Sequence, residues 1–202
     1  MAMKLEVERE SGNKMRFSLS GAPVSFANVL RRYCMSHVPV FAIDSVMVYE
    51  NTSSLFDEYI SNRFGLVPLK MASGYSREDE VLFSLDVRGP CTVYSGDLKS
   101  MDAKIKVAPG YDEIPIAKLL EGQSLRLEAK ARMGEGRAHA KFQTGLCGYE
   151  ISNDSYNFTL ESFMQLEPRA LLLAAATLAE ERCEEFEAAL EGIKLEGKKS
   201  GK

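Results

Sequence analysis

The two longest helical patterns of this 202-residue chain lie near its opposite ends, and the sequence between them is mostly β. Residues 24–36 place apolar side chains at helical spacing, and Pro39 follows soon after them. Residues 166–192 form a longer helical pattern with Pro168 near its first turn. Helices and strands at both ends can share one core, so the β-rich middle is expected as an insertion.

Strand patterns occur beside both helices and throughout the middle. Residues 4–10 and 15–20 alternate apolar and polar side chains around a Gly12-Asn13 turn, which predicts an opening hairpin. Residues 124–133 (SLRLEAKARM) show the clearest alternation of the chain. We therefore predict an α+β fold with a discontinuous domain at 1–48 and 154–195, an inserted β-rich domain at 49–153 and a disordered tail at 196–202.

Three local predictions concern shorter segments. Ser54 and Asp57 have the spacing of a capping box, which predicts a capped helix that ends at Gly65. Residues 114–122 (IPIAKLLEG) indicate a helical turn closed by glycine. Residues 137–143 (RAHAKFQ) indicate a strand that returns beside 124–133.

Composition excludes several classes of protein. The formal net charge of -4 argues against a chain that binds nucleic acid through overall charge. No apolar run approaches the roughly 18 residues of a membrane span, and the charged N-terminal segment does not resemble a signal peptide. We therefore expect a cytoplasmic protein without membrane contact. Its four cysteines lack C-x-x-C spacing, so neither metal nor cofactor is expected.

Catalytic patterns are weak. The two histidines, His37 and His139, have no adjacent base or acid in a recognisable catalytic context. The glycine-containing segments 89–97 and 134–141 match neither a phosphate-binding loop nor a dinucleotide fingerprint. We therefore expect no active site on this chain.

Basic side chains on one strand face leave an alternative open. The predicted strands over 124–141 carry five cations that could share an exposed face: Arg126, Lys130, Arg132, Arg137 and Lys141. Such a face could make the chain an independent nucleic-acid-binding module, although the aromatic platform of single-strand binders is missing. It could equally be the solvated face of a half-buried strand.

The two main helices carry more apolar surface than one face needs. Leu171, Leu172 and Leu173 together with the following alanines make the last helix apolar all round, as expected for packing on two sides. This pattern favours a protein interface, while coverage by the chain's own sheet remains the alternative.

Two adjacent arginines interrupt the first apolar helix. Neighbouring helix positions point about 100° apart, so Arg31 and Arg32 cannot share a face. One arginine can brace the fold while the other reaches a partner, because guanidinium groups suit interface ion pairs. Internal salt bridges for both are the alternative.

Most of the chain, about residues 3–191, resembles a known family. Asn28 with Leu30-Arg31-Arg32 opens a segment similar to the signature region of archaeal RNA polymerase D subunits, FANVLRRYCMSHVPVFAIDSVMVYENTSSLFDEYISNRFGLVPLK. Further similar segments are GPCTVYSGDL, GQSLRLEAKARMGEGRAHAKFQ and FTLES. More distantly, the chain resembles the third-largest eukaryotic polymerase subunit and the N-terminal domain of the bacterial alpha subunit.

The resemblance implies a non-catalytic assembly subunit of DNA-directed RNA polymerase. Family members pair with a small subunit, L, through a dimerisation domain built from both chain ends. The pair is the platform on which the large catalytic subunits assemble, and the small subunits N and P dock on it. DNA is then reached only indirectly, through the complex.

The resemblance also suggests residue roles. The helix with the double arginine would contact a large subunit through Asn28, Arg31 and Arg32, and Arg32 is the favoured contact. The helices at the two ends would supply the dimerisation residues Phe26, Leu30, Tyr33, Leu171, Leu178 and Phe186.

One departure from the family concerns a cofactor. Many archaeal D subunits insert a domain with an iron–sulfur cluster after the segment that corresponds to HAKFQ. Here the residues from 144 to 155 hold a single cysteine, Cys147, so no iron–sulfur cluster is expected.

Overall fold

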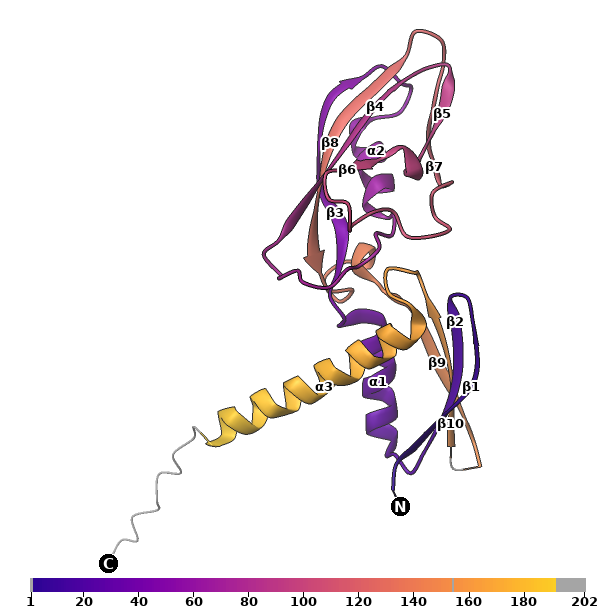
Figure 1. Cartoon of the computed structure of the whole chain (residues 1–202), viewed down its shortest axis with the longest axis vertical. Helices are drawn as coiled ribbons and strands as arrows, with labels where there is room; N and C mark the ends of the chain where they lie inside the picture. Colours follow the sequence, from indigo (N-terminus) through magenta and orange to yellow (C-terminus); the bar gives the residue numbers. More distant parts are fainter. Residues whose placement is uncertain (1, 154, 192–202) are drawn as a thin grey trace, which may run out of the picture.

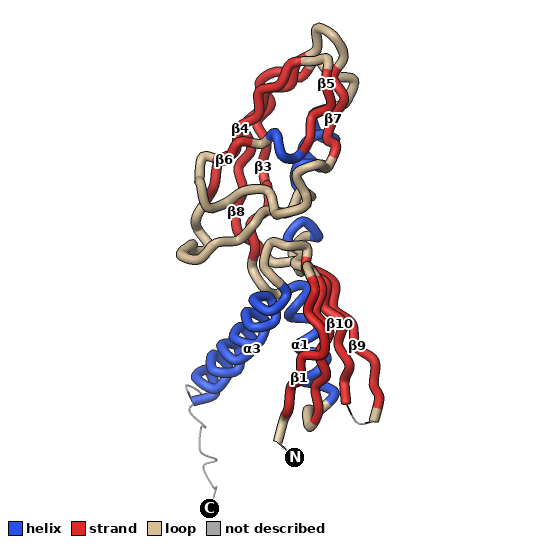
Figure 2. Tube along the Cα trace, turned by 45° about the vertical axis from the view of Figure 1, so that its right-hand side comes forward, coloured by secondary structure: helices blue, strands red, loops and turns tan. Residues whose placement is uncertain are grey.

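Two β-sheet units follow one another along the long axis of the molecule (Figure 1). The computed structural model describes residues 2–153 and 155–191. The first unit contains the N-terminus, helix α1 and the long helix α3, and the second contains α2 and the longer strands (Figures 1 and 2). The α+β class expected from the sequence is confirmed.

The sheet of the first unit joins the two ends of the chain. Its four strands pair antiparallel in the order β1-β2-β10-β9, with the bounds Lys4–Ser11, Lys14–Ser20, Ser155–Ser162 and Gly145–Ser152. The predicted hairpin is therefore present, and its second strand pairs with a strand more than a hundred residues later.

Helix α1 (Val24–Ser36) covers one face of this sheet (Figure 2). The rings of Phe17 and Phe158 stack below it with centroids 4.7 Å apart. Alternate residues of β2 and β10 point inward beside these rings and are buried, so they form an apolar layer under the helix. Helix α3 (Pro168–Glu191) packs against α1 with its first half and then projects away from the body (Figure 1).

The second unit is a four-stranded sheet backed by a helix and a small ribbon. The main sheet has the order β3-β8-β4-β6, with the bounds Val40–Asn51, Ser124–Gly134, Glu80–Arg88 and Lys99–Ser100. The remaining elements are α2 (Asp57–Gly65), the ribbon strands β5 (Cys91–Tyr94) and β7 (Pro115–Leu119), and the 3-10 turns Ser95–Asp97 and Ala140–Phe142. Leu125, Leu127 and Ala129 of β8 face the core of this unit.

The sequence analysis expects domain boundaries at 48/49 and 153/154, but the sheets in which two neighbouring segments pair do not follow these boundaries. Residues 40–48 lie in β3 and pair with β8 of the second unit. Residues 145–152 lie in β9 and pair with β10 of the first unit. The division into two folding domains stays a prediction, and residues 192–202, which include the expected tail, lie outside the described part.

Several local predictions were wrong. Residues 115–119 form strand β7, because Ile116 and Leu119 are buried in the core of the second unit and the segment pairs with β5. Residues 137–143 contain a 3-10 turn rather than a strand. Helix α2 begins at Asp57 with no side-chain cap, since Ser53 and Asn51, rather than Ser54, organise the preceding loop.

Removing one ring of the buried stack tests the core of the first unit. Phe158→Ala is expected to lower the free energy of unfolding by about 3–5 kcal/mol, since it opens a cavity under α1. Urea unfolding followed by circular dichroism measures the change. The exposed neighbour Thr159 supplies the control, because Thr159→Ala is expected to change stability by only about 0.5 kcal/mol. Equal effects of the two substitutions would contradict this account.

Candidate subunit interface

Helix α1 has two apolar stripes, of which one is buried and the other lines a groove. Ala27, Leu30 and Cys34 are buried against the sheet of the first unit. The residues one position earlier on the helix, Phe26, Val29 and Tyr33, line an open groove instead. Because consecutive positions differ by about 100°, the helix uses one side for its own core and the adjacent side for this groove.

Helix α3 forms the other wall of the groove. Ala176, Ala179, Cys183 and Phe186 lie along this wall. The groove has a volume of about 740 Å³. The small alanine side chains keep it open between the two helices. Its lining is mostly apolar and also includes Glu180, Glu187 and Arg182, and Arg182 pairs with Glu185 at 2.7 Å.

The second half of α3 has no cover from the described part of the chain. Every residue from 180 to 191 is exposed, and Phe186 keeps 64% of its surface in contact with solvent. Leu190 is 50% exposed in the same stretch. A helix that buries its first turns and extends apolar side chains beyond the fold has the character of an association surface.

The structure divides the six predicted dimerisation residues into two groups. Leu30 and Leu171, with exposed fractions of 4% and 0%, belong to the chain's own core and leave no surface for a partner. Phe26, Tyr33 and Phe186 line the groove, and Leu178 is half-buried on α3. Val29, which is not among the six predicted residues, lines the same groove, and its spacing from Phe26 and Tyr33 matches one helical face.

The two arginines have different environments. Arg31 is half-buried and donates from Nη2 and Nε to Asn28 Oδ1, at 3.0 and 3.3 Å, one helical turn earlier. Arg32 is exposed, and within the described residues its guanidinium has no hydrogen-bond or ion-pair partner. Position 32 lies far around the helix from the buried stripe, as the 100° rotation per residue requires. Arg31 is therefore fixed on its helix by Asn28, whereas Arg32 is unpaired among the residues that the structure describes.

The basic strand face is largely neutralised within the chain. Lys130 pairs with Glu80 at 2.9 Å, and both Arg132 and Lys141 pair with Asp44. Arg137 pairs with Glu135, and the Arg126 guanidinium lies 5.5 Å from the ring centroid of Tyr49. Phosphate binding depends on unpaired cations, so this arrangement does not favour the nucleic-acid alternative.

Both histidines take part in local structure. The ring of His37 stacks on Tyr33 with centroids 4.4 Å apart, and its Nδ1 lies 3.0 Å from Ser36 Oγ. His139 Nδ1 accepts a hydrogen bond from the backbone N–H of Lys141 and caps the 3-10 turn. His139 shares a small hollow with Ser61 and Asp44, but in the described residues no hydrogen bond joins its ring to either side chain, and Asp44 pairs with Arg132 and Lys141 instead.

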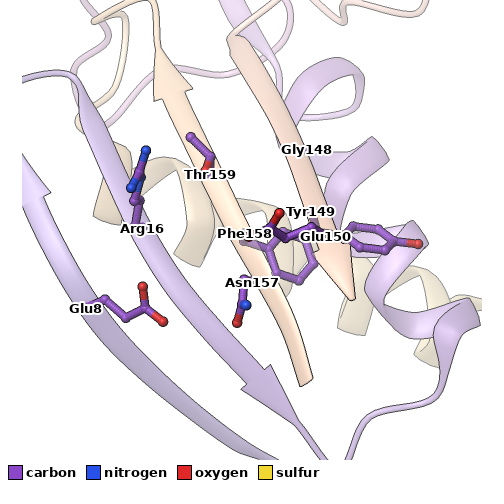
Figure 3. A pocket seen from close by; sticks show the side chains of 8 residues that line it. All are labelled: Glu8, Arg16, Gly148, Tyr149, Glu150, Asn157, Phe158 and Thr159. Carbon is purple, nitrogen blue, oxygen red and sulfur yellow. The ribbon is translucent and has the colours of Figure 1, made fainter. Parts of the chain in front are cut away.

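A polar hollow of about 420 Å³ lies on the outer face of the first sheet (Figure 3). Arg16 and Glu8 project from β2 and β1, and Asn157 and Thr159 from β10 (Figure 3). The lining contains no histidine, cysteine or serine. The side chains stand apart along the strands, so the hollow does not assemble a nucleophile with a base.

The described residues also bear on cofactors and membranes. Among them, no group of three or more His, Cys, Asp or Glu side chains is placed to hold a metal ion. All four cysteines are free thiols, two buried (Cys34 and Cys147), Cys91 half-buried and Cys183 exposed. The absence of an iron–sulfur cluster stays a prediction. In the same part of the chain, no helix is long and apolar enough to cross a membrane.

Comparison with known proteins defines the family. Residues 35–151 match the model of the RNA polymerase Rpb3/RpoA insert domain. This match covers more than half of the chain and includes the whole second unit. The chain therefore belongs to the Rpb3/RpoA family of RNA polymerase subunits.

Curated relatives narrow the assignment. The DNA-directed RNA polymerase subunit Rpo3 of Methanocaldococcus jannaschii is 40% identical over 90% of this chain and 93% of its own length. The Rpo3 subunits of Pyrococcus horikoshii and Natronomonas pharaonis are 42% and 45% identical, and the matches span 59% and 54% of their lengths. The chain belongs with the archaeal Rpo3 subunits, the D subunits of the polymerase, and works in transcription within a complex of subunits.

The double pairing of Asp44 predicts a pH dependence. A hydrogen bond from Arg132 and the nearby Lys141 lower the pKa of Asp44, although partial burial acts in the opposite direction. The stabilisation is therefore complete above the unfolded-state pKa and is lost as the pH falls through the folded-state value. Asp44→Asn is expected to cost about 1 kcal/mol at pH 7 for two surface pairs.

The pH dependence can be checked by urea unfolding between pH 7 and pH 2. The stability difference between the native chain and Asp44→Asn should disappear toward the acid end. A difference that persists unchanged across this range would show that Asp44 does not act through its ionised carboxylate.

Proposed function

We propose that this chain is a non-catalytic assembly subunit that pairs with the small polymerase subunit L through the groove between α1 and α3. The observation that carries the proposal is the projecting half of α3, whose residues from 180 to 191 are all exposed beside an apolar groove. Covering exposed apolar surface is the main driving force of stable association. A partner helix lying in this groove would contact both α1 and α3.

The groove indicates the chemistry of the partner surface. Its lining includes the aromatic rings of Phe26, Tyr33 and Phe186, which suit an apolar or aromatic counterpart. Its charged lining residues are Glu180, Glu187 and Arg182; the charge of Arg182 is offset by its ion pair with Glu185, so the two carboxylates give the groove its acidic character. We expect the contacting surface of L to be apolar at its centre and basic at its edge, because complementary charge speeds association and sets orientation.

A second contact is proposed on the remaining face of α1. Arg32 is exposed and unpaired in the described part of the chain, and Arg31 is held beside it by Asn28. A free guanidinium on a rigid helix suits bidentate recognition of a carboxylate on another subunit. We propose that this face contacts a large catalytic subunit, with Arg32 as the crossing residue.

The rest of the proposed role rests on the resemblance to polymerase D subunits. The pair of this chain with L would be the platform for the large catalytic subunits, and the small subunits N and P would dock on the same platform. The chain would act in the cytoplasm and would reach DNA only through the assembled polymerase.

Co-expression tests the pairing. The chain produced with subunit L is expected to elute as a soluble one-to-one complex on size-exclusion chromatography, while the chain alone self-associates through the uncovered groove. A well-behaved monomer that ignores L would overturn the proposal.

A substitution in the groove tests where L binds. Phe186→Glu places a charge at the centre of the apolar surface and is expected to weaken binding of L by about 2 kcal/mol or more, roughly 30-fold in Kd. Isothermal titration calorimetry measures the affinity. Ile151 is a matched control because it has the same exposed fraction, 64%, but lies on β9 outside the groove.

Ile151→Glu should therefore leave the affinity for L unchanged. Equal losses in the two variants, or no loss in Phe186→Glu, would contradict pairing through the groove.

The proposed role of Arg32 can be tested separately from pairing with L. Arg32→Ala should leave binding of L intact and weaken recruitment of a large subunit by about 2–5 kcal/mol, the cost of removing one partner of an interfacial charge pair. A pulldown of the large subunits with the tagged heterodimer measures recruitment. Arg88→Ala, at an exposed arginine ending β4, serves as the control and should recruit normally. Normal recovery with Arg32→Ala would count against this role.

A further inference from the structure

A nearly buried carboxylate, Glu135, lies where the two units meet. Only 7% of the residue is exposed. Arg137 donates from Nε to Glu135 Oε2 at 2.6 Å. Arg77 Nη1 lies 2.7 Å from Oε1 without hydrogen-bond alignment, so charge alone holds that oxygen. Arg77 belongs to the loop before β4, and Arg137 follows the end of β8, so the carboxylate joins two separate segments.

The same segment is attached to the C-terminal end of α1. The backbone N–H of Arg137 donates to the carbonyl of Ser36 at 2.9 Å. The hydroxyl of Thr144 donates to the buried carbonyl of Cys34. These bonds occupy helix carbonyls that have no partner inside the helix. The ion pair with Arg77 therefore ties a loop of the second unit to the connecting segment, and that segment in turn is bonded to the end of α1. The other faces of α1 form the core and the groove of the first unit.

Close backbone approach marks this connection. A Cβ at Gly136 would lie 2.9 Å from the carbonyl oxygen of Met35 and 3.0 Å from Cα of Ser36. A Cβ at Gly134 would lie 2.6 Å from the ring of Phe142. A larger residue at either position would force these neighbours to shift, so Glu135 lies between two closely packed glycines.

A second set of contacts runs parallel to the first. Gln165 Nε2 donates to the carbonyl of Gln143 at 3.0 Å, and the N–H of Met71 donates to the carbonyl of Gln165 at 2.7 Å. Beside them, Phe142 is buried with Val40 and Ala42. The connection therefore has polar and apolar parts, as expected of a rigid joint rather than a linker.

We propose that Glu135 is a positioning residue that holds the two units at one fixed angle. The proposal goes beyond pairing with L, because it concerns the geometry in which the groove and the second unit are presented together. Burial raises the pKa of Glu135, whereas the hydrogen bonds and charges of Arg137 and Arg77 lower it by a larger amount. The pKa of Glu135 is therefore below its usual value. The carboxylate is therefore ionised at neutral pH, as the two ion pairs require.

Pulsed electron–electron double resonance, which measures the distance between two spin labels, tests the joint on the full chain without any partner. Spin labels are placed on cysteines introduced at two exposed positions, Thr159→Cys on β10 and Lys118→Cys on β7. Cys91→Ser and Cys183→Ser remove the accessible native thiols, while Cys34 and Cys147 are buried. The labelled chain is diluted with excess unlabelled chain, so that self-association adds no distances between labels on different chains, and it is expected to give one narrow distance distribution between the units.

Glu135→Gln keeps the size of the side chain, removes its charge and is expected to broaden this distribution. Glu80→Gln removes the partner of a single ion pair inside the second unit and should leave the distribution narrow. Arg77→Ala removes one of the two ion pairs of Glu135 by changing an exposed side chain. It gives a second test if Glu135→Gln does not fold. Its expected result is also a broader distribution.

Restoring the charge provides the check against a merely structural role. Glu135→Asp retains the carboxylate. Its distance distribution should be narrower than that of Glu135→Gln when the two variants have the same thermal stability. A distribution as narrow as that of the native chain in folded Glu135→Gln or Arg77→Ala would overturn the proposal. This outcome leaves pairing with L untouched, since no partner takes part in the measurement.

Discussion

The packing of α1 against the sheet of the first unit is the interaction on which the rest of the structure depends. Burial of Ala27, Leu30 and Cys34 fixes the rotation of the helix about its axis. That rotation places Phe26, Val29 and Tyr33 at the groove and leaves position 32 in solvent. A helix with one apolar stripe would only cover its sheet, whereas the second stripe of α1 makes it part of a surface for another chain.

The groove and the joint use the same helix. Phe26 and Val29 lie toward the start of α1, while the carbonyls of Cys34 and Ser36 receive bonds from the connecting segment at its end. The helix therefore links the proposed pairing surface to the second unit. A subunit that assembles others needs this property, because partners that contact different units must meet in one geometry.

The sequence was informative wherever local pattern decides structure. Both end helices, the opening hairpin and the strand over residues 124–133 followed from periodicity, and the family followed from the segment around Arg31 and Arg32. Strand β7 was misread because burial of its residues depends on pairing with β5, which no local pattern records. Leu30 and Leu171 were assigned to an interface for the same reason: an apolar stripe does not say whether its own sheet or another chain covers it.

Hydrogen–deuterium exchange of the chain with and without subunit L tests the central claim most directly, because it locates the surface that L covers. The account predicts that L slows exchange of backbone amides in residues 24–36 and 176–191, the two walls of the groove. Exchange in the strands of the second unit, residues 40–134, should change little. Slowed exchange confined to residues 40–134, with both helices unaffected, would contradict the account.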